Sequence, residues 1–178
     1  ITINDVPDAG TANPTIDICD SSTVAIDLFG LISGEQPGGV WTQLTGSGGV
    51  FNAATGTYTL VSGALTSTFR YTIAGVLPCV DDTVDVAINV HSQPNAGTAG
   101  TVTICESNTA LIDLYGLISG EQAGGIWTRL TGNGGLFDAM NGTYTPTVGA
   151  TDSTFQYEIA GTIPCVNSTS IATININP

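Results

Sequence analysis

The sequence contains no lysine and only two arginines, Arg70 and Arg129, against fifteen aspartates and glutamates, which gives a formal net charge of −13. Nucleic-acid binding and attachment to anionic membrane surfaces both need clusters of basic residues. Neither is expected of this chain. A G-x-x-x-x-G-K-[ST] phosphate loop is also excluded, because it needs a lysine. The acidity instead predicts a soluble surface on which neighbouring molecules repel one another.

Histidine occurs once, at His91, and the corresponding position in the second half of the chain is Asn177. A Ser-His-Asp or Cys-His catalytic set therefore cannot form within each half. Chemistry based on paired carboxylates is the enzymatic alternative that remains. We expect the protein not to be an enzyme.

Long hydrophobic runs and helical periodicity are also missing. Hydrophobic residues make up 42% of the chain, but no run approaches the 18 residues of a membrane-spanning helix, so no membrane insertion is expected. Glycine, threonine, valine and isoleucine dominate, and turn residues recur every 8–12 positions. This pattern is typical of an all-β sandwich.

A tandem repeat organises the sequence. Residues 30–41 read GLISGEQPGGVW and residues 116–127 read GLISGEQAGGIW. With an offset of 86, residues 19–90 align without a gap to the second copy at about 60% identity. We expect two immunoglobulin-like β-sandwich domains of about seven strands each, over residues 7–92 and 93–178. The strands expected in the first copy are 15–19, 24–29, 40–45, 50–51, 57–61, 66–74 and 83–90.

Residues 1–6 resemble the end of the first repeat, because ITIN precedes Pro7 much as INVH precedes Pro94. We therefore expect residues 1–6 to be the tail strand of a preceding repeat and the chain to be a window from a longer array. The linker 92–100 is short and contains Pro94, which favours a semi-rigid connection between neighbours.

Each repeat contains one pair of cysteines, at equivalent positions. No C-x-x-C or histidine-rich spacing indicates zinc. We expect one disulfide per domain, Cys19–Cys79 and Cys105–Cys165, and hence an oxidising compartment outside the cytoplasm. Buried reduced thiols are the alternative.

Metal binding has one candidate set of residues. Asp27 and Glu35 recur as Asp113 and Glu121, and calcium prefers carboxylates and loop carbonyls. The alternative is that these carboxylates are solvated surface groups, and no other cofactor is expected. In the first repeat alone, residues 81–82 are a second, weaker calcium candidate.

Aromatic residues recur at the positions of Trp41, Phe51, Tyr58, Phe69 and Tyr71. Exposed tryptophan and tyrosine rings could stack on sugars. Alternation along the strands favours core packing instead, and a tryptophan beside a disulfide is common in immunoglobulin-like sandwiches.

Five motifs appear in both copies: AGT, IC[DE]S, IDL[FY]GLISGE, GG[VI]WT and STF-x-Y-x-IAG-x-x-PC. They are spread along the chain from Ala9 to Cys165, and the chain resembles the tandem repeats of very large Bacteroidetes surface proteins, the gliding-motility adhesins exported by the type 9 secretion system. The resemblance implies extracellular, disulfide-bonded, immunoglobulin-like modules at the cell surface. It also implies O-glycosylation at Asp-Ser/Thr-apolar sites, for which Thr83 and Ser153 are the candidates.

The expected function is thus a structural repeat pair from a long extracellular adhesin or cell-surface filament. Its expected partners are the neighbouring repeats of the same chain, with self-association into filaments. The alternative is a module that binds carbohydrate or another surface ligand, with or without calcium. A concave, exposed aromatic cluster around Trp41 would favour this alternative.

Overall fold

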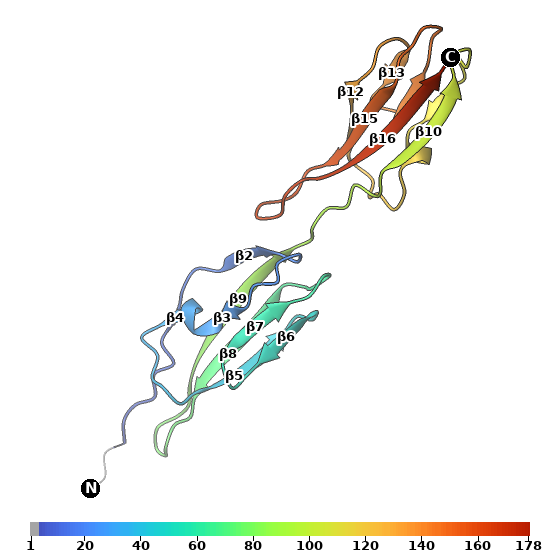
Figure 1. The fold of residues 1–178 in the computed structure, drawn as a ribbon. Coiled ribbons are helices and arrows are strands. Elements are labelled where there is room, and N and C mark those ends of the chain that lie inside the picture. The colour runs from blue at the N-terminus through green and yellow to red at the C-terminus, as the bar shows by residue number, and fades with distance from the viewer. Residues whose placement is uncertain (1–3) are drawn as a thin grey trace. The chain divides into compact units, whose positions relative to one another are not determined.

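The computed structural model describes residues 4–178, which form two compact units (Figure 1). The first unit consists of Ile1–Ser92 together with Thr162–Cys165, and the second of Gln93–Gly161 together with Val166–Pro178. The short segment Thr162–Cys165 belongs to the second repeat in sequence but groups with the first unit in space. This segment contains Cys165, which is part of the candidate functional site.

Within the described residues, the first unit has nine strands and one 3₁₀ helix. A four-stranded sheet has the order β2-β9-β8-β5, a three-stranded sheet the order β3-β7-β6, and β1 pairs with β4. All pairings are antiparallel except that of β2 with β9, which is parallel. The elements are β1 (Thr11–Ala12), β2 (Ile16–Cys19), β3 (Ile26–Asp27), η1 (Leu28–Leu31), β4 (Ile32–Ser33), β5 (Val40–Thr45), β6 (Gly49–Asn52), β7 (Thr57–Leu60), β8 (Ser67–Ile73) and β9 (Asp82–His91).

The second unit repeats this plan. Its sheets have the orders β10-β16-β15-β12 and β11-β14-β13, and β10 lies parallel to β16. A single bridge between Thr98 and Ser119 takes the place of the β1–β4 pair. The elements are β10 (Gly100–Cys105), β11 (Ile112–Asp113), η2 (Tyr115–Leu117), β12 (Ile126–Thr131), β13 (Leu136–Asp138), β14 (Thr143–Thr145), β15 (Ser153–Ile159) and β16 (Ser168–Asn177).

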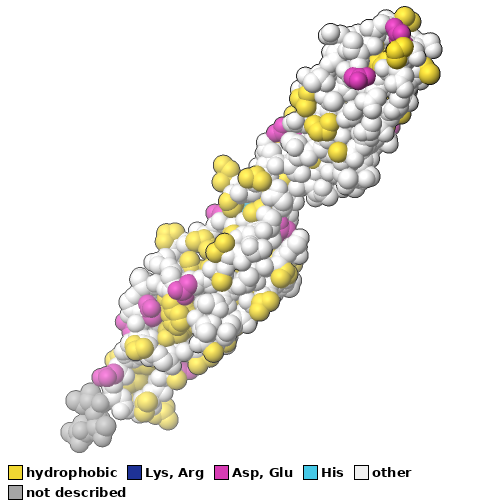
Figure 2. All heavy atoms as spheres, viewed as in Figure 1, with side chains coloured by type: hydrophobic (Ala, Val, Ile, Leu, Met, Phe, Trp, Pro, Cys, Tyr) yellow, Lys and Arg dark blue, Asp and Glu magenta, His cyan; other side chains and the backbone are white. Residues whose placement is uncertain are grey.

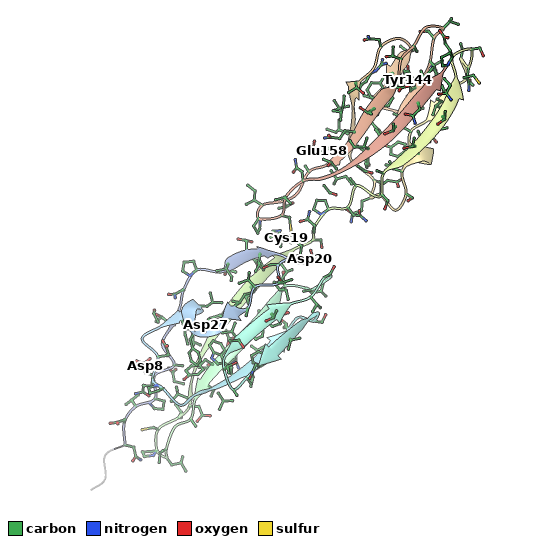
Figure 3. The ribbon with its side chains drawn as sticks, in the orientation of Figure 1. Asp8, Cys19, Asp20, Asp27, Tyr144 and Glu158 are labelled. Atoms are coloured by element: carbon green, nitrogen blue, oxygen red, sulfur yellow. A yellow bond between two sulfur atoms is a disulfide. The ribbon has the colours of Figure 1, made fainter. Side chains whose placement is uncertain are left out.

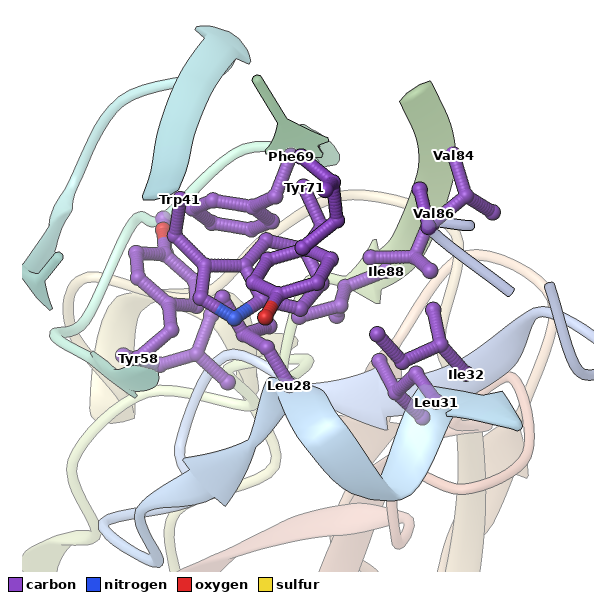
Figure 4. Packing of buried hydrophobic residues seen from close by; sticks show 14 residues of the cluster. Leu28, Leu31, Ile32, Trp41, Tyr58, Phe69, Tyr71, Val84, Val86 and Ile88 are labelled. Carbon is purple, nitrogen blue, oxygen red and sulfur yellow. The ribbon is translucent and has the colours of Figure 1, made fainter. Parts of the chain in front are cut away.

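Strict alternation creates the core of each unit. Along β8, every second side chain from Ser67 to Ile73 is buried. The rings of Trp41, Tyr58, Phe69 and Tyr71 meet there beside the aliphatic side chains of η1 and β9 (Figure 4). The ring centroids of Trp41 and Tyr71 lie 5.2 Å apart, and those of the equivalent pair in the second unit lie at the same distance. The repeated aromatics are therefore core residues.

One expected strand is mostly absent. Residues 24–29 were predicted as a strand, but only Ile26–Asp27 pairs, and the chain then turns into η1. The Asp27 side chain causes this turn, since its Oδ1 accepts a hydrogen bond from the Phe29 amide at 3.0 Å. The other six predicted strands of the first repeat are present, with small shifts of their ends.

The expected tail strand at the start of the chain falls partly on residues 1–3, which lie outside the described residues. Residues 4–6 form no strand. Across residues 4–178, no helix combines the length and the apolar character that crossing a bilayer requires.

Candidate functional site

A disulfide joins Cys19 of the first repeat to Cys165 of the second, with the two Cα atoms 5.0 Å apart. Cys19 lies at the end of β2 (Figure 3). Cys79 and Cys105 are not bonded. The predicted pairings Cys19–Cys79 and Cys105–Cys165 are therefore wrong, and the bond connects two repeats instead of closing one.

The parallel pairing of β2 with β9 explains why the predicted bond cannot form. Cys19 lies opposite His91, where β9 ends, whereas Cys79 lies in the loop before β9 begins. β9 has ten residues, and a strand rises about 3.3 Å per residue, so the two cysteines are separated by about 30 Å. A disulfide needs Cα atoms within about 7 Å.

The end of β2 holds Cys19 in a defined turn. The Asp20 amide donates to the His91 carbonyl at 2.9 Å, and the Ser22 amide donates to the Cys19 carbonyl at 3.0 Å. Cys19 is 8% exposed, and so is Asp20, whose Oδ2 accepts a hydrogen bond from the Gly63 amide at 3.1 Å. The cysteine is therefore presented from a rigid strand end that other parts of the chain cover.

Cys165 comes from the loop between β15 and β16. The loop is closed by two hydrogen bonds, from the Cys165 amide to the Thr162 carbonyl at 2.8 Å and from the Gly161 amide to Asn167 Oδ1 at 2.9 Å. Cys165 is 5% exposed, and its sulfur lies 3.3 Å from the His91 carbonyl oxygen. Because a disulfide sulfur carries no hydrogen, this is a packing contact.

The candidate calcium ligands are not brought together. Asp27 and Asp113 each cap a turn by accepting a backbone amide hydrogen bond. Within residues 4–178, no group of three or more acidic, cysteine or histidine side chains is placed to hold a metal ion, and this includes Glu35 and Glu121. Acidic side chains are scattered over the face shown in Figure 2. The structure therefore lends no support to a calcium site.

Three of the described carboxylates, those of Asp17, Asp85 and Asp138, have pKa values below their usual range. The Arg70 guanidinium forms a two-pronged ion pair with Asp85, at 2.7 and 2.8 Å, and this hydrogen bonding lowers the pKa of Asp85. Hydrogen bonding to the His91 ring likewise lowers the pKa of Asp17. The Arg70–Asp85 pair is exposed at the surface, and the Asp17–His91 pair is partly exposed.

The tryptophans offer no stacking surface for sugars, because Trp41 is 1% exposed and Trp127 is 2% exposed. The two candidate glycosylation sites differ. Thr83 is exposed on β9, and its modification stays a prediction. Ser153 is 0% exposed, and its hydroxyl donates to the Thr151 carbonyl at 2.9 Å, so the folded protein cannot carry a sugar there.

Sequence reasoning missed the inter-repeat bond. Two signals were available: the uninterrupted alternation from Val84 to Val90, and the presence of equivalent cysteines in both copies. The alternation predicts a long strand after Cys79, which places that cysteine at one end of the domain. The parallel position of β2 was not available from sequence, and without it the position of Cys19 could not be deduced.

Comparisons with solved structures support the β-sandwich fold described above. The chain is similar to the insect immune protein hemolin, with a TM-score of 0.54 and 10% sequence identity over 93% of this chain and 46% of the hemolin chain. It is also similar to the I-band fragment I67-I69 of titin, with a TM-score of 0.51 and 9% identity over 95% of this chain and 64% of the titin fragment.

The chain thus spans less than two thirds of either structure's length. No family model and no curated protein sequence matches it. At such low identities the likeness establishes the fold alone. The chain consists of tandem immunoglobulin-like β-sandwich domains, and a disulfide links its two repeats.

Proposed function

We propose that the chain is a structural repeat pair from the shaft of a long extracellular adhesin or cell-surface filament, of the kind exported by the Bacteroidetes type 9 secretion system. The observation that carries the proposal is the Cys19–Cys165 bond between successive repeats. A bond that connects repeats serves an array, whereas an isolated domain gains stability from a bond within itself.

The arrangement of the terminal strands supports a mechanical role. In the four-stranded sheet of each unit, the strand that comes first along the chain lies beside and parallel to the strand that comes last. These pairs are β2 with β9 and β10 with β16. The chain enters at the start of the first strand and leaves at the end of the last. In a chain whose Cys19–Cys165 bond is reduced, tension therefore slides the two strands past each other and loads all their ladder hydrogen bonds together. Breaking several bonds at once resists force better than breaking them singly.

The disulfide adds a covalent limit to extension. It joins residues 146 positions apart, so the chain between them cannot lengthen under tension even if both domains unfold. At about 3.5 Å per extended residue, the bond prevents an extension of about 500 Å. A shaft protein under load benefits from this limit.

The compartment and the surface charge fit the same function. Structural disulfides persist in oxidising surroundings, which favours a location outside the cytoplasm. The net charge of −13 keeps neighbouring molecules apart in solution. The partners that we propose are the neighbouring repeats of the same chain, and the Cys19–Cys165 bond supports this proposal.

Immunogold electron microscopy of the source cells tests the function. Antibodies raised against residues 1–178 should label thin filaments outside the cell, at many points along each filament. Gold particles confined to the cytoplasm, or to a single point on each structure, would contradict the shaft role. Pre-incubation of the antibodies with the purified chain is the control and should remove the labelling.

A further inference from the structure

We propose that Cys105 and Cys79 form the same inter-repeat bond with the repeats that flank this pair. Cys105 would bond to the cysteine equivalent to Cys165 in the following repeat, and Cys79 to the cysteine equivalent to Cys19 in the preceding one. The inference rests on the proposed function, since it needs neighbouring repeats on both sides. Inter-repeat disulfides would then link successive repeats all along the shaft.

The backbone around Cys105 matches that around Cys19. Cys105 ends β10 opposite Asn177, as Cys19 ends β2 opposite His91. The Glu106 amide donates to the Asn177 carbonyl at 2.7 Å, and the Asn108 amide donates to the Cys105 carbonyl at 2.9 Å. These are the counterparts of the two hydrogen bonds that hold Cys19. The backbone that carries Cys105 is therefore hydrogen-bonded in the same way as the backbone that carries Cys19.

The strand ends that carry Cys19 and Cys105 match in their backbone hydrogen bonds but differ in exposure. Cys19 is buried, whereas Cys105 is exposed and lines a surface hollow together with Glu106, Ser107, Val148 and Pro178. The occupant that we assign to this hollow is the β15–β16-type loop of the next repeat. Such a loop, Thr162–Cys165, is part of the first unit and supplies the cysteine bonded to Cys19.

The loop around Cys79 matches the loop around Cys165. The Cys79 amide donates to the Val76 carbonyl at 3.0 Å, and the Gly75 amide donates to Asp81 Oδ1 at 2.8 Å. The Cys79 loop thus presents its thiol in the backbone setting from which Cys165 forms its bond.

A second, independent observation concerns Asn4, whose side chain lies beside the Cys79 loop. Asn4 aligns with His91 when Pro7 is matched to Pro94. Its Nδ2 donates to the Leu77 carbonyl at 3.3 Å, within the Cys79 loop. His91 contacts Cys165 through its carbonyl oxygen in the corresponding place. Asn4, the residue matched to the one opposite Cys19, therefore lies at the loop that the proposal assigns to the partner cysteine.

Formation of the bond is a two-step thiol–disulfide exchange, in which a disulfide compound of the extracellular compartment is the oxidant. The Cys105 thiolate attacks the oxidant's disulfide, forms a mixed disulfide and releases one thiolate. The thiolate of the next repeat's cysteine then attacks the Cys105 sulfur and releases the second. Two cysteine thiols lose two protons and two electrons, and the oxidant becomes two thiols.

The chain segments closed by successive disulfides overlap along the sequence. In an array with the offset of 86, the loop from Cys105 begins before the loop from Cys19 has closed at Cys165. A covalent path along the shaft then runs from one disulfide to the next through only about 26 residues for every two repeats. Fully extended, these residues span about 90 Å. A continuously stapled shaft would stay close to this length even if every domain unfolded.

An extended chain tests the proposal. Residues 93–178 are appended directly after Pro178, which occupies the repeat position of Ser92 and so keeps the register. After oxidation with oxidised glutathione, the thiols are alkylated and the disulfides are mapped by mass spectrometry without reduction. We expect Cys19–Cys165 together with a bond from Cys105 to the Cys165 of the appended copy. The first Cys79 and the appended Cys105 should be alkylated.

Two variants of the extended chain control this result. Cys105→Ser should lose the second bond, keep the first and leave one additional thiol, that of the appended Cys165. Cys79→Ser should keep both bonds. Alkylation of Cys105 in the oxidised chain, or a bond from it to Cys165 of its own repeat, would overturn the proposal. Neither outcome bears on the filament labelling described above, so the two ideas can fail separately.

A mixing experiment keeps the proposal testable if the extended chain does not fold. The 178-residue variants Cys79→Ser and Cys105→Ser are oxidised singly and together, and dimers are measured on non-reducing gels. The proposal requires several-fold faster dimer formation in the mixture, because only there do both bonding partners meet. Equal rates in the mixture and in the single variants would count against it.

Discussion

At the scale of single residues, one tyrosine hydroxyl fastens the glycine-rich connection to the core in each unit. The Tyr71 hydroxyl donates to the Gln36 carbonyl at 2.9 Å and accepts from the Gly39 amide at 2.9 Å. A Cβ on Gly39 would come within 2.4 Å of the Tyr71 ring, so the position requires glycine. Tyr157 makes the same two contacts in the second unit.

Replacing Tyr71 by phenylalanine should lower the free energy of unfolding of the first unit by about 1–3 kcal/mol, because two partly buried backbone groups lose their partner. Tyr157→Phe should have the same effect on the second unit. Tyr115→Phe is the matched control, since Phe29 occupies the equivalent position and that change should cost under about 0.5 kcal/mol. Urea denaturation measures all three. Equal costs for Tyr71→Phe and Tyr115→Phe would contradict the assignment.

The ion pair between Arg70 and Asp85 predicts a pH-dependent difference. Because the pKa of Asp85 is lowered in the folded state, its contribution is present above the unfolded value of about 3.9 and is lost as the pH falls through the folded value. Asp85→Asn should therefore destabilise the chain at neutral pH, and the difference from the wild type should shrink towards about pH 2.

Urea denaturation at several pH values measures this difference. The equivalent pair in the second unit is Gln156 opposite Ile171, which carries no charge. Ile171→Val should therefore show no pH-dependent difference from the wild type. A constant difference for Asp85→Asn between neutral and acidic pH would rule out the ion pair as its source.

At the scale of elements, the β13–β14 hairpin depends on one glycine beside the tryptophan. Gly142 has φ +63°, and a Cβ there would lie 2.6 Å from Trp127 Nε1 and from the Tyr115 ring. The turn therefore requires glycine at this position for two reasons, its positive φ and its closeness to the core. This local requirement couples the hairpin to the packing of β12.

Gly142→Ala should destabilise the second unit by about 3 kcal/mol, through backbone strain and displacement of the Trp127 ring. Two controls separate these causes. Gly149→Ala, with φ +79° but open space around it, should cost about 1 kcal/mol. Gly116→Ala, with open space and no positive φ, should cost little. Thermal unfolding followed by tryptophan fluorescence ranks the three. If Gly142→Ala and Gly149→Ala had equal costs, contact with Trp127 would not matter.

At the scale of the whole molecule, the Cys19–Cys165 bond determines how far the chain can be pulled. Single-molecule stretching from the two ends should give almost no gain in contour length while the bond is intact. After Cys165→Ser, unfolding should release about 500 Å more chain, because 146 positions are no longer bridged.

Cys79→Ser is the control for this stretching experiment. Cys79 occupies the equivalent loop but forms no bond, so its removal should leave the contour-length gain unchanged. A large gain in the wild-type chain under oxidising conditions would show that Cys19 and Cys165 are not bonded in solution. Addition of a reducing agent should convert the wild type to the behaviour of Cys165→Ser.

Local patterns made much of the fold predictable. The alternation of Phe69, Tyr71 and Ile73 predicted β8 and its buried face, and the aromatic core followed from the same pattern. The 3₁₀ turn after Asp27 was missed, because a side-chain cap there overrides an apolar sequence that is typical of a strand. The candidate calcium ligands shared a sequence pattern, but the fold does not gather them into one site.

By itself, the sequence determined that the chain forms two similar all-β units, because side-chain alternation and turn residues act between near neighbours and are repeated at a constant offset. Only the tertiary structure decided which cysteines bond. That choice depends on β2 lying parallel to β9, which places Cys19 and Cys79 at opposite ends of a ten-residue strand. A disulfide spans only a few ångströms, so Cys19 bonds to the cysteine that the fold brings beside it, Cys165 of the next repeat.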